Sequence, residues 1–303
     1  MAWKKIAILA AAVLTALVPM IPIQAEELPS AQEPVQAEVP LEESFQREEF
    51  ECFRDGLKIS GELLLPDQAA PMPLVICAHG YCGNRYDVSE YARVFAENGI
   101  AACIFDFIGG GPAIRSDGLT TEMSVLTQAQ DLQVILDTMK ADPRFNPEQI
   151  FLLGESQGGF VGTYVAEERP EDFAGLVLLY PAYEIPDEAR ALAPDPDHIP
   201  ERVEDMGMEI GSVYLRDAMS VDIYANMGVI DQSVLIIYGT EDPIVPFPYI
   251  ERALEILPGA ELVLVDGGKH GFIGQTRLDV AQTAADFVWG LIIGQESGEP
   301  MTY

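Results

Sequence analysis

Six short apolar runs, separated by segments of helical character, limit most strongly how this chain can fold. They span residues 74–78, 100–105, 150–153, 176–179, 234–238 and 262–265. Their continuous apolarity is typical of parallel strands buried on both faces of a sheet. Between the second and third runs, residues 125–139 carry apolar side chains at helical spacing, as a helix covering such a sheet requires. Alternation on both sides of Asp55-Gly56 predicts a β-hairpin at the start. We therefore expect an open α/β fold whose sheet is mostly parallel.

The N-terminal part of the chain differs in composition from the rest. Lys4 and Lys5 precede an apolar run over residues 6–23, which predicts a secretory signal peptide over residues 1–25. A retained membrane anchor is the alternative, because Ile23 is larger than the small residue usually found three positions before a cleavage point. Residues 26–49 are rich in Pro, Glu and Ala and predict a flexible acidic leader. One folded domain is then expected over residues 50–295.

Charge and cysteine content exclude some classes of partner. The chain has 49 acidic and 17 basic residues and a formal net charge of −32, so nucleic acid and anionic lipid are not expected to bind it. Cys77 and Cys103 lie in expected buried strands, which favours buried thiols, although the sequence leaves the pairing of the four cysteines open. Cys77, His79 and Cys82 resemble a metal cluster, but no fourth ligand is spaced nearby. No metal and no other cofactor is expected.

One serine occupies a position typical of a nucleophile. Ser156, in the segment Gly154-Glu155-Ser156-Gln157-Gly158, follows an apolar run and precedes a segment that can form a helix up to Pro170. In open α/β sheets the chemistry lies at the carboxyl ends of the strands. A serine in such a strand-to-helix turn holds its hydroxyl above the sheet, next to N–H groups at the start of the helix. We interpret Ser156 as the nucleophile.

A serine hydroxyl needs a nearby base before it can attack. Of the three histidines, His198 lies in a Pro- and Asp-rich segment and His79 lies upstream of Ser156. His270 follows the last apolar run in a glycine-rich loop, so we expect it at the same sheet edge as the serine. His270 is therefore the predicted general base.

The base in turn needs a carboxylate that orients it. Asp242 follows the apolar run 234–238, which places its side chain on the edge expected for the serine and the histidine. Glu241 and Asp266 are competing candidates. We prefer Asp242, because its loop follows a strand and the order Ser, Asp, His is that of the α/β-hydrolase triad.

Three segments carry a resemblance to a known family. GESQGG, GTEDPIVP and GGKHGF are similar to the nucleophile, acid and histidine loops of the α/β-hydrolase superfamily, and AHGYCGNRYD and FDFIGGGPAIRSDG resemble segments of bacterial feruloyl (cinnamoyl) esterases. The resemblance implies an α/β-hydrolase fold: a mostly parallel eight-stranded sheet with helices on both faces and a small cap insertion. It also implies that the backbone N–H groups of Tyr81 and Gln157 form the oxyanion hole, and that His79 shapes that loop.

The sheet pattern stops over residues 184–231, which this resemblance identifies as the cap over the active site. Tyr214, Tyr224 and Met208 are the predicted substrate-binding residues, because tyrosine and methionine line adaptable pockets well. The prediction is a secreted serine hydrolase that cleaves small-molecule carboxylic esters, of short-chain or hydroxycinnamoyl type, through an acyl-enzyme. A prolyl-oligopeptidase-like peptidase with the same triad is the first alternative. A non-catalytic binding protein with this fold is the second.

Overall fold

The computed structural model describes residues 44–297, with side chains to residue 295. The predicted signal peptide and most of the predicted leader lie outside these residues. Strands β1 (Phe45–Arg54) and β2 (Leu57–Pro66) form the predicted hairpin, with positive φ at Asp55 (52°) and Gly56 (85°), as a type I′ turn requires. The predicted leader boundary at residue 49 is wrong, because residues 45–49 already pair with β2. Their charged side chains suggested a leader, but they occupy an edge strand where most side chains are exposed.

The eight-stranded sheet has the order β1-β2-β4-β3-β5-β6-β9-β10. Its remaining strands are β3 (Met72–Ala78), β4 (Ala101–Phe105), β5 (Phe145–Glu155), β6 (Gly175–Leu179), β9 (Val234–Gly239) and β10 (Ala260–Val265). β2 pairs antiparallel with both β1 and β4, and all other neighbours are parallel. This confirms the predicted, mostly parallel sheet. The expectation that every apolar run is buried on both faces is wrong for β10, an edge strand in which Leu264 is 52% exposed. Each of the six apolar runs lies in one of these six strands, apart from Ile100 at the edge of β4.

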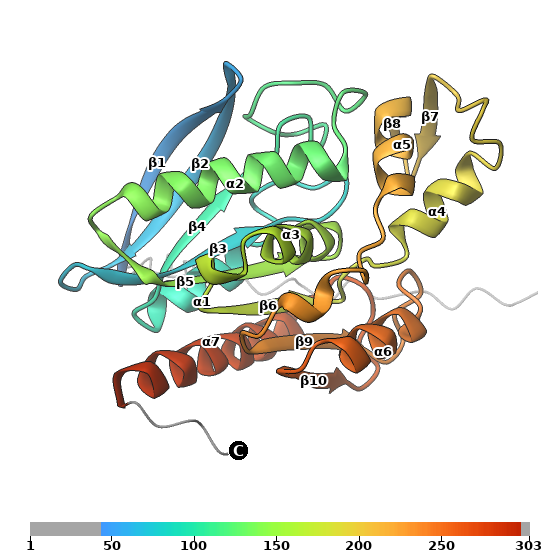
Figure 1. Cartoon of the computed structure of the whole chain (residues 1–303). Coiled ribbons are helices and arrows are strands. Elements are labelled where there is room, and N and C mark those ends of the chain that lie inside the picture. Colours follow the sequence, from blue (N-terminus) through green and yellow to red (C-terminus); the bar gives the residue numbers. More distant parts are fainter. Residues whose placement is uncertain (1–43, 298–303) are drawn as a thin grey trace, which may run out of the picture. The chain divides into compact units, whose positions relative to one another are not determined.

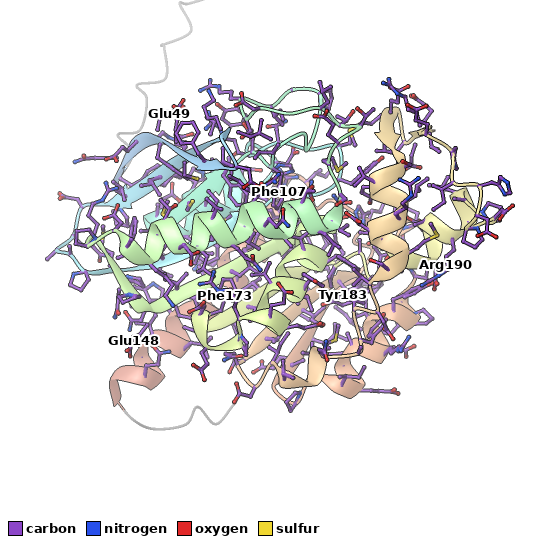
Figure 2. All side chains as sticks on the ribbon, turned by 45° about the horizontal axis from the view of Figure 1, so that its top comes forward. Glu49, Phe107, Glu148, Phe173, Tyr183 and Arg190 are labelled. Atoms are coloured by element: carbon purple, nitrogen blue, oxygen red, sulfur yellow. The ribbon has the colours of Figure 1, made fainter. Side chains whose placement is uncertain are left out.

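Helices cover both faces of the sheet, as predicted (Figure 1). Helices α2 (Val125–Ala141) and α3 (Gln157–Glu168) pack against each other on the face toward the viewer, and α1 (Ser89–Glu97) and α7 (Gly274–Ser297) pack against each other behind it. Helix α6 (Phe247–Ile256) follows β9. Side chains fill the space between these layers: Figure 2 labels Phe107 and Tyr183, which are buried, and Glu148 and Arg190, which lie at the surface. No helix of residues 44–297 is long and apolar enough to cross a membrane.

The segment between β6 and β9 forms a small cap. It contains α4 (Ile185–Leu192), the hairpin of β7 (Arg202–Asp205) and β8 (Met208–Gly211), α5 (Ser212–Ser220) and the short helix η2 (Met227–Val229). Figure 1 shows α4, α5, β7 and β8 gathered to one side of the main sheet. The hairpin touches the loop before α2: the Thr120 hydroxyl donates to the Glu209 carbonyl oxygen, and a Cβ on Gly211 would lie 2.0 Å from the Thr121 carbonyl oxygen. Only glycine fits there, which lets the cap approach the main domain closely.

Candidate active site

Ser156 sits in a strained turn between β5 and α3. Its φ of 53° and ψ of −117° are unusual for a residue with a side chain, and such strain is typical of functional positions. The flanking glycines are required by close packing. A Cβ on Gly158 would lie 2.3 Å from the Ala78 carbonyl oxygen, and one on Gly154 would lie 2.6 Å from the Gly158 carbonyl oxygen. Small residues therefore allow the turn, and the turn holds the serine hydroxyl above the sheet.

The structure brings the three residues of the predicted triad into one hydrogen-bonded series. Nδ1 of His270 lies 2.9 Å from Oδ2 of Asp242, and Nε2 of His270 lies 3.0 Å from Oγ of Ser156. Because a carboxylate only accepts, Nδ1–H donates to Asp242, and Nε2 is left to accept the serine proton. The Asp242 side chain is fully buried, and its Oδ1 accepts from the backbone N–H groups of Ile244 (2.8 Å) and Val245 (3.1 Å). The carboxylate is thus held in one orientation toward the imidazole.

The competing candidates lie elsewhere. Glu241 and Asp266 are exposed, and neither hydrogen-bonds His270. His198 has a side chain that is 82% exposed and pairs with Asp195 on the surface of the cap. Within residues 44–297, none of these three side chains hydrogen-bonds Ser156 or His270.

The loop after β3 places Tyr81 beside the serine. A Cβ on Gly80 would lie 3.3 Å from Cβ of Ser156. The loop backbone therefore passes directly over the strand-to-helix turn that carries Ser156, which we call the nucleophile elbow. The N–H groups of Tyr81 and Gln157 donate no hydrogen bond to another group of residues 44–297, which leaves both available for a substrate oxygen. An oxyanion hole needs unpartnered donors beside the nucleophile, and the roles of Tyr81 and Gln157 in one stay predictions.

His79 holds this loop from inside. The backbone N–H of Phe107 donates to Nε2 of His79 (3.2 Å), so Nδ1 carries the proton and donates to the Gly80 carbonyl oxygen (2.8 Å). The ring is fully buried, and burial lowers the pKa of His79 and favours the neutral form that this pattern needs. His79 therefore shapes the loop and has no contact with Ser156, as the resemblance implied.

Other side chains also support the site, although the sequence analysis did not select them for this role. The ring of Tyr180 packs on the His270 imidazole with centroids 4.5 Å apart. The Gln157 side chain donates to Gln128 on α2 (2.8 Å) and accepts from the Tyr214 hydroxyl on α5 (2.6 Å). Tyr180 follows β6 at the catalytic edge, so its position could have been noticed. Gln128 looked like any residue on a helix, and only the fold shows that it links α2 to the elbow.

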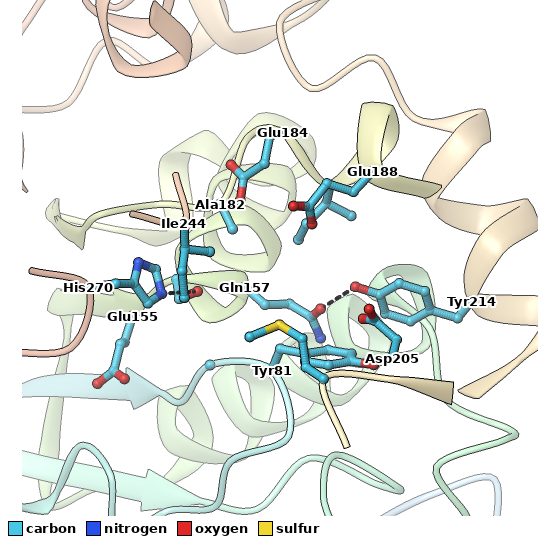
Figure 3. A pocket seen from close by; sticks show the side chains of 14 residues that line it. Tyr81, Glu155, Gln157, Ala182, Glu184, Glu188, Asp205, Tyr214, Ile244 and His270 are labelled. Atoms are coloured by element: carbon cyan, nitrogen blue, oxygen red, sulfur yellow. Dashed lines mark hydrogen bonds between the residues drawn. The ribbon is translucent and has the colours of Figure 1, made fainter. Parts of the chain in front are cut away.

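A cavity of about 160 Å³ opens beside Ser156 and His270 (Figure 3). Its wall combines apolar side chains, including Ile185 and Ile244, with polar groups from both the cap and the main domain. Of the three predicted substrate-binding residues, Tyr214 lines this cavity.

Met208 and Tyr224 do not line the cavity. Met208 is 4% exposed, because alternation along β8 turns it into the core, and Met206, in the turn before β8, lines the cavity instead. Tyr224 borders a separate cavity, where Arg252 lies 3.9 Å from its ring centre and its hydroxyl donates to the Tyr249 carbonyl oxygen. The predictions for Met208 and Tyr224 are therefore wrong. Both residues have packing partners that the sequence did not reveal.

The thiols take no part in this site. All four cysteines are free, and Cys77 and Cys103 are fully buried, which raises the pKa of each thiol. Buried thiols of this kind are inert hydrophobic side chains.

Known proteins share this fold. Residues 69–204, which include Ser156, match the family model described as serine aminopeptidase, S33. Monoglyceride lipase from Mus musculus is 32% identical over 114 residues, covering 37% of this chain and 35% of the lipase. The match thus spans about a third of the length of that relative.

Two solved structures match most of the chain. Est1E from Butyrivibrio proteoclasticus, with ferulic acid bound, has a TM-score of 0.74 and 24% identity over 80% of this chain and 99% of its own. The α/β hydrolase GrgF from Penicillium sp. sh18 has a TM-score of 0.66 and 20% identity over 81% of this chain and 98% of its own. Together with the sheet order and the strand-to-helix turn of Ser156 described above, these matches show that the chain has the α/β-hydrolase fold.

Proposed function

We propose that this protein is a secreted serine esterase that cleaves small carboxylic esters, of short-chain or hydroxycinnamoyl type, through an acyl-enzyme. The observation that carries the proposal is the hydrogen-bonded series from Asp242 through His270 to Ser156, next to two available N–H donors. Secretion is proposed from the N-terminal sequence alone.

The geometry supports a two-step acyl transfer. Oγ of Ser156 attacks the ester carbonyl while Nε2 of His270 takes its proton, and buried Asp242 stabilises the imidazolium. The N–H groups of Tyr81 and Gln157 stabilise the negative oxygen of the tetrahedral intermediate. His270 then donates the proton to the leaving alcohol. Water attacks the acyl-enzyme by the same sequence and releases the acid.

Leaving-group chemistry separates an esterase from the peptidase alternative. We expect kcat/KM for p-nitrophenyl butyrate to exceed that for butyryl p-nitroanilide by at least about tenfold. We likewise expect kcat/KM for methyl ferulate to exceed kcat/KM for aminoacyl p-nitroanilides. Initial rates with purified protein measure both ratios. A faster amide would favour the peptidase, and no turnover of any substrate by correctly folded protein would favour the binding protein.

The assignment of the base predicts a pH dependence. Only a neutral imidazole can accept the serine proton, so kcat/KM should fall at acidic pH, where the protonated ring can no longer act as a base. His270→Ala should abolish the activity over the whole pH range. His198→Ala is the matched control, because this histidine is exposed and pairs only with Asp195, and its pH profile should equal that of the wild type. Equal damage from both substitutions would overturn the assignment.

A further inference from the structure

The cavity beside Ser156 is more acidic than the acyl-transfer chemistry requires. Four carboxylates line it: Glu155, Glu184, Glu188 and Asp205. No lysine or arginine is among its lining residues in the described part of the chain. The triad does not use these carboxylates, since Asp242 already orients His270.

Among these four carboxylates, Glu184 gives the strongest reason to expect a ligand in the cavity. It is 4% exposed, yet its Oε2 has no hydrogen-bond partner within residues 44–297. A buried polar atom without a partner is costly, and native structures rarely tolerate it without a functional reason. Burial, and then the charges of Glu188 and Asp242, raise the pKa of Glu184 to about 8. A cation beside this carboxyl group would favour its ionised form.

The surrounding groups suit a positive charge. Glu184 precedes α4 and Glu188 lies in its first turn, four residues later, so both side chains are on one face of that segment. Figure 3 shows their carboxylates near each other on one side of the cavity, with Asp205 beside Tyr214 on another. Tyr81 and Tyr214 add two aromatic rings with centroids 5.7 Å apart. Carboxylates together with aromatic rings are typical of sites that recognise ammonium groups.

We propose that this cavity binds a positively charged ammonium group of the substrate, recognised chiefly by Glu184 with Glu188 and Asp205. The enzyme then acts preferentially on esters that carry an ammonium group in the acyl part or in the alcohol part. The preference in hydrolysis rests on the proposed esterase function, whereas the binding of the cation does not. This extends the expectation of an ester substrate by assigning the charge of its recognised group.

Two pairs of esters, each equal in shape and different in charge, test the proposal. Acetylcholine and 3,3-dimethylbutyl acetate place the charge in the alcohol part, and ethyl 4-(trimethylammonio)butanoate and ethyl 5,5-dimethylhexanoate place it in the acyl part. We expect kcat/KM at pH 8 to favour the cation by at least about tenfold in one pair. That pair also identifies the side of the ester that enters the cavity. A ratio at or below one in both pairs, in protein that hydrolyses p-nitrophenyl butyrate, would overturn the proposal.

Substitutions test whether Glu184 and Glu188 recognise the ammonium group. Glu184→Gln keeps the shape and removes the charge, and we expect it to lower the cation-to-neutral ratio to within about threefold of one. Glu188→Gln, at a more exposed position, should lower the ratio less and keeps the test open if Glu184→Gln does not fold. Glu204→Gln is the control, because Glu204 is exposed in the same cap hairpin and does not line the cavity. It should keep the wild-type ratio. An unchanged ratio in both cavity variants would overturn the assignment.

The pH dependence gives a second readout. Besides Glu188 and Asp242, four phenols interact electrostatically with Glu184, and burial raises the pKa of each, so they stay uncharged: Tyr214 on α5, Tyr224 after α5, Tyr238 on β9 and Tyr249 on α6. Glu184 ionises as the pH rises toward about 8, and the quaternary ammonium keeps its charge. The cation-to-neutral ratio should therefore rise between pH 6 and about 8 and then level off. The rise should be smaller in Glu184→Gln, where Glu155, whose pKa burial raises to about 7, still ionises in the same cavity. Taking the ratio cancels the dependence on His270 that both esters share.

Binding without turnover separates this inference from the esterase proposal. Titration calorimetry of Ser156→Ala with each ester pair measures affinity alone. We expect the cationic ester of one pair to bind at least about tenfold more tightly than its neutral partner. If the wild type hydrolyses no ester, the esterase proposal fails, and this affinity ratio alone decides the inference. Equal affinity within both pairs would overturn it.

Discussion

Replacing Ser156 with alanine is expected to lower kcat for ester hydrolysis by about 10⁴- to 10⁶-fold. The hydroxyl is the atom that becomes acylated, and its Oγ is the group that His270 contacts at 3.0 Å. The remaining N–H donors and the cavity still bind substrate, so a small residual rate is expected. Steady-state kinetics on p-nitrophenyl butyrate measure the loss. A fluorophosphonate probe should label the wild type stoichiometrically at Ser156 and leave the variant unlabelled.

The control is an exposed serine of the cap. Ser220→Ala removes a hydroxyl that donates only to the Asp217 carbonyl oxygen, and both labelling and kcat should stay at wild-type values. Labelling of the wild type at any other serine, or no labelling of correctly folded protein, would rule out the esterase proposal.

Asp242→Asn is expected to lower kcat by about 10⁴-fold while the fold is kept. The asparagine carbonyl can still accept from the N–H groups of Ile244 and Val245, so the loop keeps its shape. Its amide, however, cannot stabilise the imidazolium, and an NH₂ group facing Nδ1 would favour the wrong tautomer of His270. Circular dichroism and thermal melting check the fold, and steady-state kinetics measure kcat.

Asp266→Asn is the matched control for the acid. Asp266 is exposed in the loop before His270 and does not contact the imidazole. Its substitution should change kcat by less than about threefold. A larger loss from Asp266→Asn than from Asp242→Asn would move the orienting carboxylate to Asp266.

The strands of the main sheet were predictable because their signal is local. A strand covered on both faces must be apolar throughout, so β3, β4, β6 and β9 stand out without reference to the rest of the chain. The edge strand β1 lacks this signal, since most of its side chains face solvent, and its first residues resembled the leader. The small hairpin of β7 and β8 has only four residues in each strand, too few for a periodic pattern to be recognised.

The triad residues could be selected from the sequence, but the contacts between them could not. Ser156 was recognisable because close packing of the backbone around its turn requires glycine at positions 154 and 158. The five residues 154–158 are therefore enough to identify the turn. Asp242 and His270 could be selected because each follows a strand of a parallel sheet, and all such strands end at one edge. The distances that link the three residues came only from the folded chain.

The sequence by itself determined the class of fold, the turn that carries Ser156 and the sheet edge where the site lies. Each of these depends on the conformation of a few consecutive residues, and their side chains encode it directly. Tertiary structure alone decided that Met206 and Tyr214 face the cavity while Met208 and Tyr224 face other partners. It also decided that, within residues 44–297, Oε2 of Glu184 is buried without a hydrogen-bond partner in the cavity beside Ser156. The orientation of a cap side chain depends on packing against segments far away in the chain, which no local pattern records.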